Sequence, residues 1–382
     1  MQFRDLKKQY KILKSEMDTA IGRVLAESNF ISGRQVTELE TRLASYVGVK
    51  HCITCASGTD ALTLAFMVWN VGTGDAVFVP DFTFFASGEA PAYVGATPVF
   101  VDVEENTFNM SSASLEEAIV QVKKEGNLNP RVIVAVDLFG QPADYQQIRK
   151  IADKYGLLVL EDGAQGFGGR IDGQRACSFG DISITSFFPA KPLGCYGDGG
   201  AVFTDNDKWA ESLYSMRVHG KGLDKYNNVR IGMNSRLDTM QAAVLLVKLK
   251  AFEEWELENV NKAAARYMEQ LDGVVKTPKV KAAFFSSWAQ YCILLKNETE
   301  RNGLQEYLKE KGIPTMVYYP KPMSRQGAFG GMDCVKTDLS VTANICRRVL
   351  ALPMHPYLTE GEQDDVVRGI KTFYDKRILG ES

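Results

Sequence analysis

Residues 132–163 read VIVAVDLFGQPADYQQIRKIADKYGLLVLEDG, and this stretch decides the fold. The β-branched run 132–136 predicts a buried strand, the amphipathic stretch 145–156 predicts a helix, and the apolar run 157–160 predicts a second strand. A strand, a helix and a strand in this order form a right-handed crossover. We therefore expect two parallel strands with a helix packed over one face of the sheet.

The same alternation of strand and helix extends over residues 50–205. Short apolar runs such as CIT, AVFVP and TPVFVDV alternate with amphipathic stretches such as DALTLAFMVW and SLEEAIVQVKK, and DISITSFF and GAVFTD look like further strands. The pattern predicts an α/β protein whose mainly parallel sheet carries helices on both faces. In open sheets of this kind ligands gather beyond the carboxyl ends of the strands, so the residues that follow each run are the first candidates for a site.

The remainder of the chain predicts a second, smaller unit. Residues 237–272 form one long amphipathic helical pattern. It is followed by the strand-like segments AQYCILL and TMVYY and by helical segments at 300–311 and 339–350. We therefore expect a large domain over residues 1–240, and a linking helix with a small α+β domain over residues 241–382.

Composition and charge exclude several classes of function. The 382 residues are 45% hydrophobic and 24% charged, and 44 Lys plus Arg against 47 Asp plus Glu give a net charge of -3. This charge provides neither a basic surface for nucleic acid nor a polybasic membrane anchor. The charged N-terminus lacks the apolar centre of a secretory signal, and no apolar run approaches the roughly 20 residues that span a bilayer. We expect a cytoplasmic protein without nucleic-acid or membrane partners.

Cysteine and histidine usage argues against disulfides and metal. Seven cysteines at irregular spacing are typical of buried thiols in a reducing compartment. Cys52 and Cys55 form a CxxC pair, but they lie in an apparent strand, where core positions are favoured over redox or metal use. The three histidines, His51, His219 and His355, are not spaced with cysteines or carboxylates as a zinc site requires. We expect no metal centre.

Ser57-Gly58-Thr59-Asp60 stands directly before the helical segment ALTLAFMVW. Small residues at the start of a helix allow backbone N–H groups to close on an anion, above all a phosphate. Serine, threonine and aspartate are also the usual caps of a helix, so this segment alone fits either role.

In LLVLEDGAQ an apolar strand ends in Glu161 and Asp162, with Gln165 three residues beyond Asp162. A carboxylate at this place can hold a heteroaromatic nitrogen protonated. The pyridine ring of pyridoxal 5'-phosphate (PLP) needs such a partner, because the protonated ring acts as an electron sink. The same acid could instead bind Mg²⁺ or cap the next helix.

The segment TSFFPAKPLGCYGDGG is the most specific in the chain. Lys191 lies between two prolines that fix the local backbone, and the glycines after it allow close approach of another group. A lysine whose pKa is lowered by burial or by a nearby positive charge becomes a nucleophile toward an aldehyde. Ser186 could donate its hydroxyl to the same phosphate as Gly58 and Thr59. The alternative, a surface lysine in a loop, fits the proline and glycine frame less well.

IGMNSRLDTMQAAVL places Asn234 and Arg236 just before the long helix. Arg236 could form a bidentate pair with a carboxylate, and Asn234 could donate to a phosphate. Both residues are equally typical of the region around a helix N-cap.

The segments SGTDAL, DFTFFAS, EDGAQ, SFFPAKPLG…GDGG and GMNSRLD occur in that order, and over nearly its whole length the chain resembles the sugar aminotransferases of the DegT/DnrJ/EryC1/StrS family. The resemblance implies PLP as the cofactor and PLP fold type I, an aspartate-aminotransferase-like fold whose large domain has a mainly parallel seven-stranded sheet. The lysine segment and RIGMNSRLDTMQAA most resemble the enzymes that aminate UDP-2-acetamido-2-deoxy-3-oxo-glucuronate.

The family pattern implies a role for each matching residue. Lys191 would bind PLP as a Schiff base and serve as the catalytic acid and base, Asp162 would pair with the ring nitrogen, and Gln165 would contact the ring hydroxyl. Phe84, in the FTF segment, would stack on the ring. The phosphate would be held by Gly58, Thr59, Ser186 and, from the neighbouring subunit of a homodimer, Asn234.

The resemblance also implies substrate contacts at Arg236, Tyr318 and Tyr319. Relatives commonly have His-Tyr-Pro where this chain has Tyr318-Tyr319-Pro320, so Tyr318 replaces the usual histidine. Relatives that dehydrate sugars instead of aminating them carry histidine at the position of Lys191. The lysine therefore indicates transamination.

The expected reaction is amination of a nucleotide-linked ketosugar with L-glutamate as donor, at C3 of a UDP-2-acetamido-2-deoxy-3-oxo-glucuronate type substrate, for surface-polysaccharide (O-antigen or capsule) synthesis. One alternative is a C3 or C4 aminotransferase for a dTDP- or UDP-linked 6-deoxy ketosugar. A second is a PLP-binding regulator without turnover, which neither a helix-turn-helix nor a basic patch supports. A nucleotide-binding oxidoreductase would need G-x-G-x-x-G after an early strand, and the chain has none.

Overall fold

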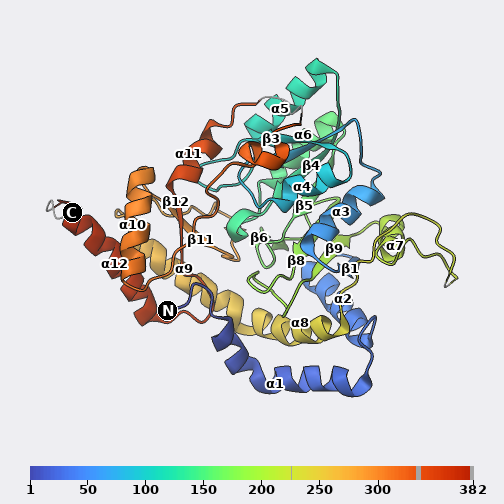
Figure 1. The fold of residues 1–382 in the computed structure, drawn as a ribbon, viewed down its shortest axis with the longest axis horizontal. Helices are drawn as coiled ribbons and strands as arrows, with labels where there is room; N and C mark the ends of the chain where they lie inside the picture. The colour runs from blue at the N-terminus through green and yellow to red at the C-terminus, as the bar shows by residue number, and fades with distance from the viewer. Residues whose placement is uncertain (225, 333–336, 379–382) are drawn as a thin grey trace.

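A seven-stranded sheet forms the centre of the molecule (Figure 1), in a computed structural model that describes residues 1–224, 226–332 and 337–378. Its strands are β1 (His51–Cys55), β2 (Asp75–Pro80), β3 (Thr97–Val101), β4 (Asn129–Val136), β5 (Leu158–Asp162), β8 (Ile182–Ser186) and β9 (Gly200–Thr204). They lie in the order β1-β9-β8-β5-β4-β2-β3. Only β9 runs antiparallel to its neighbours, so the predicted α/β fold with a mainly parallel sheet is confirmed.

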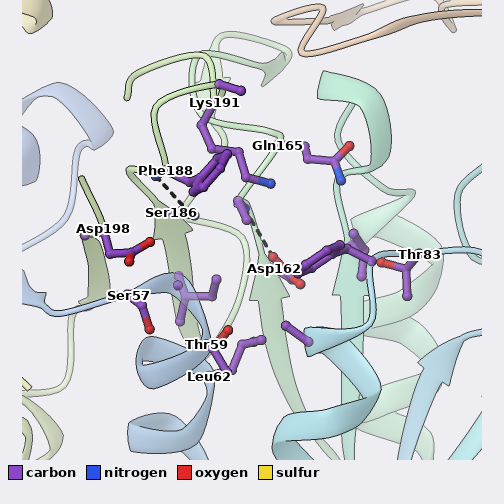
Figure 2. Close-up of a pocket in the computed structure, with 18 of the residues that line it drawn as sticks. Ser57, Thr59, Leu62, Thr83, Asp162, Gln165, Ser186, Phe188, Lys191 and Asp198 are labelled. Atoms are coloured by element: carbon purple, nitrogen blue, oxygen red, sulfur yellow. Dashed lines mark hydrogen bonds between the residues drawn. The ribbon is translucent and has the colours of Figure 1, made fainter. Parts of the chain in front are cut away.

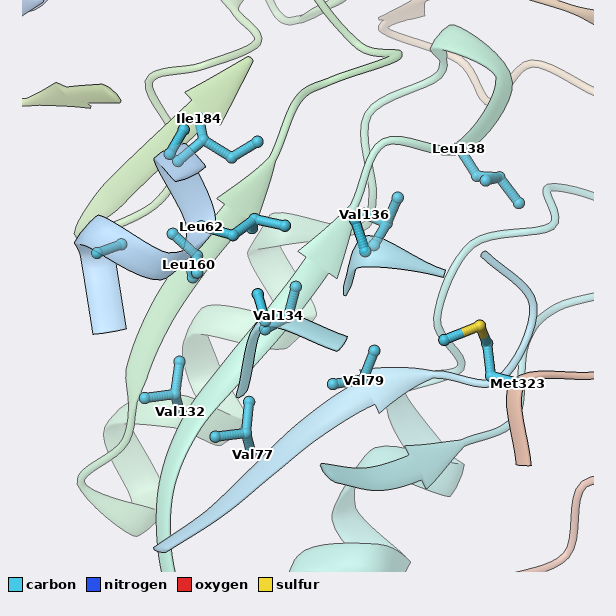
Figure 3. Packing of buried hydrophobic residues seen from close by; sticks show 14 of the residues in the cluster. Leu62, Val77, Val79, Val132, Val134, Val136, Leu138, Leu160, Ile184 and Met323 are labelled. Carbon is cyan, nitrogen blue, oxygen red and sulfur yellow. The ribbon is translucent and has the colours of Figure 1, made fainter. Parts of the chain in front are cut away.

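Helices cover both faces of the sheet because the strand side chains alternate between the faces. The helices are α1 (Leu6–Glu27), α2 (Arg34–Val47), α3 (Gly58–Val68), α4 (Ala86–Tyr93), α5 (Ser112–Glu125), α6 (Tyr145–Tyr155), α7 (Asp207–Met216) and α8 (Thr239–Ala251). On β4, Val132, Val134 and Val136 pack with α3, α4 and α7, as Figure 3 shows for part of this cluster. Ile133 and Ala135 point to the opposite face and pack with α5 and α6. Near β1 and β9 the second face is covered by α2 and α8.

The C-terminal part is built around a two-stranded antiparallel sheet of β11 (Tyr291–Leu294) and β12 (Val349–Leu352). Its helices are α9 (Leu257–Leu271), α10 (Glu298–Glu310), α11 (Ser340–Arg348) and α12 (Glu360–Ile378). The expected long helix is present, with one π-helical turn at Phe252–Glu256 between α8 and α9. This part has its own apolar core, consistent with an α+β unit, while the boundary at residue 240 stays a prediction.

Short elements complete the described chain. They are β6 (Arg170–Ile171), β7 (Gln174–Arg175) and β10 (Phe284–Phe285), which pair with one another, and the 3-10 turns Leu138–Gly140, Met323–Arg325 and Gly327–Phe329. Within the described ranges, every helix is too short or too polar to cross a membrane.

Two predictions for the C-terminal part are wrong. TMVYY is not a strand: one bridge joins Met316 to Ala351, and Pro314 and Pro320 on either side remove the donors that a longer ladder needs. The helix expected over 339–350 ends at Arg348, because the next four residues pair with β11 as β12.

Cys52 and Cys55 are buried free thiols on β1. Burial raises the pKa of Cys55 to about 12 and holds the pKa of Cys52 well above its ordinary value. A thiol that stays protonated is a poor nucleophile and a poor metal ligand, so the core interpretation of this CxxC pair is confirmed.

Candidate active site

A cavity of about 400 Å³ opens at the carboxyl edge of the sheet. The cavity is lined by the segments that follow β1, β2, β5 and β8, by the segment that precedes β9, and by residues of the C-terminal part. Strands that run in the same direction end at the same edge, which brings these distant segments together. Figure 2 shows their side chains converging on this space, and the predicted site residues in it are Gly58, Thr59, Phe84, Asp162, Gln165, Ser186, Lys191, Tyr318 and Tyr319.

Lys191 extends from the proline-framed turn into the cavity (Figure 2). Its Nζ lies 5.9 Å from the centre of the Phe84 ring. Burial lowers the pKa of Lys191, the Asp162 carboxyl opposes this shift, and the positive charge of Arg4 adds to it. The net lowering leaves a larger fraction of neutral amine, which is the nucleophilic form.

Asp162 ends β5 and is only 5% exposed. Its Oδ2 accepts a hydrogen bond from the Ser87 hydroxyl at 2.7 Å, and its Oδ1 accepts one from the Ala164 N–H at 3.2 Å. Burial nevertheless raises the pKa of this carboxyl, because two neutral donors and Lys191 do not replace full hydration. A cation placed directly against Asp162 would reverse that shift and stabilise the carboxylate.

The first turn of α3 forms one end of the cavity. Ser57 caps the helix by accepting a hydrogen bond from the Asp60 N–H at 3.0 Å, so the N–H groups of Gly58 and Thr59 stand at the positive end of the helix dipole. A Cβ on Gly58 would lie 2.8 Å from the Cβ of Ser186. Glycine is therefore required for Ser186 to reach the same place as the helix N-terminus, and together they form a site for an anion.

Gln165 and two tyrosines form the opposite wall. The Phe139 N–H donates to Oε1 of Gln165 at 2.9 Å, which directs Nε2 toward the Tyr319 hydroxyl at 3.2 Å. The Phe84 ring is 53% exposed and tilted against the Tyr319 ring, with 6.4 Å between centroids. One face of Phe84 is thus available to a planar ligand.

Asn234 and Arg236 do not line the cavity of their own chain. Between them, Ser235 is buried, where it accepts a hydrogen bond from the Ala56 N–H and donates one to Asp60. Because Ser235 points inward, its two neighbours point away, and Asn234 is exposed. The Arg236 guanidinium donates to the Asn234 side chain at 2.7 Å.

The sequence did not single out three polar residues of the cavity lining, Thr83, Asp198 and Gln290, or Ser87 behind it. Ser87 orients Asp162 by donating a hydrogen bond to its carboxyl. Thr83 and Ser87 lie within DFTFFAS, and their hydroxyls are 3.2 Å apart. The contact of Ser87 with Asp162 joins segments that are 75 residues apart in the chain, so no local pattern could have revealed it.

This fold, with Lys191 and Asp162 in one cavity at the carboxyl edge of the sheet, is typical of the PLP-dependent enzymes of fold type I. Within that class the chain belongs to the DegT/DnrJ/EryC1/StrS aminotransferase family, whose sequence profile matches residues 11–371. It is therefore a PLP-dependent aminotransferase.

Individual proteins agree with this assignment. The UDP-2-acetamido-2-deoxy-3-oxo-D-glucuronate aminotransferase of Pseudomonas aeruginosa is 45% identical, over 94% of this chain and 96% of its own. A DegT DnrJ EryC1 StrS aminotransferase from Brucella abortus has a crystal structure with a TM-score of 0.95 at 48% identity, covering 98% of this chain and 99% of that one. The crystal structure of ntda from Bacillus subtilis, with bound cofactor PMP, has a TM-score of 0.86 at 28% identity and covers 98% and 83%.

The residues of this cavity fit PLP. A buried carboxyl that lacks a directly bonded cation suits a protonated ring nitrogen, and a helix start that is accessible only because residue 58 is glycine suits a phosphate. The Phe84 ring provides a face for stacking between these two ends.

Proposed function

We propose that this enzyme transfers the amino group of L-glutamate to C3 of a UDP-2-acetamido-2-deoxy-3-oxo-glucuronate type sugar, in the cytoplasm, for the synthesis of surface-polysaccharide sugars. The observation that carries the chemistry is the presence of Lys191 and Asp162 in one cavity, with an anion site beside them. The sugar rests on similarity to the aminotransferase of Pseudomonas aeruginosa.

Each residue then has a defined task. When bound, PLP supplies the electron sink that makes a proton on the adjacent carbon acidic. Asp162 keeps the ring nitrogen protonated, Gln165 donates to the ring hydroxyl, and Phe84 covers one face of the ring. The phosphate is held by Gly58, Thr59 and Ser186.

Lys191 has two tasks, since it anchors the cofactor and also moves the proton. Its Nζ takes a proton from the α-carbon of L-glutamate, and in the second half of the cycle it returns one to C3 of the sugar. The lowered pKa of Lys191 suits both transfers, because an amine that is too basic would remain protonated.

We further propose a homodimer in which Asn234 of each chain reaches the phosphate of the other. The exposure of Asn234 and its position outside the cavity of its own chain support this arrangement. In a two-fold symmetric dimer, each active site would receive from the other chain the Asn234 side chain that its own chain does not provide.

The proposal is tested by incubating the purified protein with L-glutamate and a panel of UDP- and dTDP-linked ketosugars, and measuring the aminated product by mass spectrometry. The Lys191→Ala variant should lose turnover and borohydride trapping of PLP. Lys208→Ala, at an exposed lysine away from the cavity, is the matched control. Full activity of Lys191→Ala would overturn the assignment, and PLP binding without product from any sugar would favour a regulator.

One observation favours a second substrate class. Among the described residues that line the cavity, Lys191 is the one cation, so nothing else in the chain's own cavity neutralises the C6 carboxylate of a uronate. A dTDP- or UDP-linked 6-deoxy ketosugar would not need such a partner. If Arg236, from either chain, binds the carboxylate, Arg236→Lys should lose more activity toward the 3-oxo uronate than toward its 6-hydroxy analogue, because lysine cannot form the bidentate pair. An equal loss would contradict a role in uronate selection.

A further inference from the structure

The Lys191 turn, residues 187–195, is closed by its own backbone. The Lys191 N–H donates to the Phe188 carbonyl at 2.8 Å, and the Cys195 N–H donates to the Phe187 carbonyl at 2.7 Å. A Cβ on Gly194 would lie 2.6 Å from the carbonyl oxygens of Phe188 and Pro189. The turn is therefore compact, and its remaining carbonyl groups need donors from elsewhere.

Two cationic side chains supply donors to two of these carbonyls. The Arg4 guanidinium donates to the Lys191 carbonyl at 2.6 Å, and Nζ of Lys248 donates to the Gly194 carbonyl at 2.7 Å. Lys248 comes from α8, is 1% exposed, and lies 4.3 Å from the centre of the Tyr196 ring. A buried lysine is costly unless it is bonded, so its position here indicates a specific contact.

We propose that Arg4 and Lys248 together fix the Lys191 turn, and that Arg4 is in addition a positioning residue for the Lys191 amine. The inference rests on the proposed role of Lys191 as the lysine that binds PLP.

Residues on both sides of Arg4 are anchored to the C-terminal part. The Phe3 carbonyl accepts a hydrogen bond from the Met354 N–H at 3.3 Å, and the Phe3 ring meets the edge of Tyr318 at 6.1 Å between centroids. Nζ of Lys8 donates to the Tyr357 carbonyl at 2.7 Å. Arg4 therefore lies between the Lys191 turn and two segments of the C-terminal part. One segment contains Met354 and Tyr357, and the other contains Tyr318, which lines the cavity.

The two cations hold different carbonyls of the turn, since Arg4 bonds the carbonyl of Lys191 itself whereas Lys248 bonds that of Gly194. Burial lowers the pKa of the Lys191 amine, Asp162 opposes this shift, and the charge of Arg4 adds to it. A positive charge bonded to the backbone of Lys191 disfavours a second one on its amine. Burial lowers the pKa of Arg4, while Glu256, Tyr357 and Tyr318 oppose this shift and so favour the charged guanidinium.

Lys248 lies near Arg4, but it acts on the turn through its hydrogen bond to the Gly194 carbonyl. Burial lowers the pKa of Lys248 to about 8, Glu256 opposes this shift, and Arg4 adds to it. His355, also beside Arg4, has a pKa of about 4 as a result of burial and is neutral near pH 7. Removing Lys248 therefore takes away a bond to the turn without removing the charge that acts on Lys191.

This difference defines the experiment, which follows the absorption spectrum of PLP-loaded enzyme from pH 5 to pH 10. The midpoint of the spectral change reports the proton on the nitrogen that joins lysine and cofactor. Arg4→Met and Arg4→Gln should shift this midpoint upward, because the proton is no longer repelled. Arg4→Lys should stay close to the wild type, and Lys248→Met should leave the midpoint in place while weakening the turn, seen as a lower melting temperature.

The outcomes are separable. An unshifted midpoint in both neutral Arg4 variants, or an equal shift in Lys248→Met, would overturn the role of Arg4. Two substitutions at Arg4 guard against a variant that fails to fold. If the wild type shows no lysine-bound PLP spectrum, the proposed role of Lys191 itself is wrong, which is a different result from an unshifted midpoint.

Discussion

Gly58 illustrates how a missing side chain can determine a binding site. We predict that Gly58→Ala raises the dissociation constant for PLP by about fivefold to a hundredfold, because the added Cβ forces apart the helix start and Ser186, and such overpacking costs about 1–3 kcal/mol. The affinity is measured by titrating the apoenzyme with PLP. Gly22→Ala is the matched control, since Gly22 lies on α1 with nothing within 4 Å of an added Cβ. Equal affinity in the two variants would contradict the steric explanation.

His355 makes stability depend on pH. Its ring nitrogens find no partner among the described residues, and burial, reinforced by Arg4, lowers its pKa to about 4. In the unfolded chain His355 is protonated as the pH falls through about 6.5, whereas in the folded chain it is protonated only near pH 4. The free energy of unfolding therefore decreases as the pH falls from about 6.5 to about 4. Between pH 7.5 and pH 5 this histidine should remove about 2 kcal/mol from the free energy of unfolding. In urea titrations His355→Phe should show a smaller loss, and an unchanged pH dependence would rule out His355 as its source.

At the scale of residues, the sequence predicted the members of the cavity that stand directly after strands. Lys191 and Asp162 belong to short motifs, so their placement required only the carboxyl-edge rule for parallel sheets. Arg4 and Lys248 could not be predicted, because an amphipathic helix and its approach segment give no indication of which distant carbonyl a cation will meet.

The contact between β1 and its covering elements depends on one partly buried ion pair. Arg217, just after α7, lies 2.5 Å from Glu40 of α2, and both contact Thr54 of β1. Their side chains are 16% and 9% exposed. We predict that Arg217→Met lowers the free energy of unfolding by about 3–5 kcal/mol, because Glu40 keeps its charge without a cation.

The control for this prediction is the exposed pair of Arg34 and Glu27, whose side chains are 65% and 36% exposed. Arg34→Met should cost about 0–1 kcal/mol, because water screens the pair. Adding Glu40→Gln to Arg217→Met should recover part of the loss. Equal costs for the two arginine variants in denaturant unfolding would refute the importance of burial.

At the scale of elements, periodicity identified the strands and helices of the central sheet but not where each ended. The helix predicted over 339–350 included Val349 and Leu350, yet pairing with β11 makes these two residues the start of strand β12. Tertiary pairing overrides local preference for such short apolar segments.

The proposed sharing of active sites between two chains can be tested by mixing subunits. Neither Lys191→Ala nor Asn234→Ala homodimers should be fully active. In a mixed dimer, one site would combine both defects and the other would have both residues intact. Random mixing should therefore restore about a quarter of the wild-type activity, because half of the dimers are mixed and each has one sound site. No recovery after subunit exchange, verified by differently tagged chains, would show that Asn234 serves its own cavity.

For the whole molecule, alternation of elements predicted the fold class and the edge at which the cavity lies. It did not reveal that the segment before α1 returns to the Lys191 turn, or that α1 lies along α8 (Figure 1). Those contacts join regions separated by about half of the chain or more, and hydrophobic periodicity carries no information about such distant contacts.

The place of β1 beside β9 has a consequence for biosynthesis. His51 pairs with Thr204, so this strand finds its partner only after about 150 further residues have been made. At a ribosomal rate of 5–20 residues per second, the unpaired strand waits roughly 8 to 30 seconds. During that time an apolar edge is open to other nascent chains. We expect newly made protein to depend on chaperones in this interval more than the stability of the finished sheet would suggest.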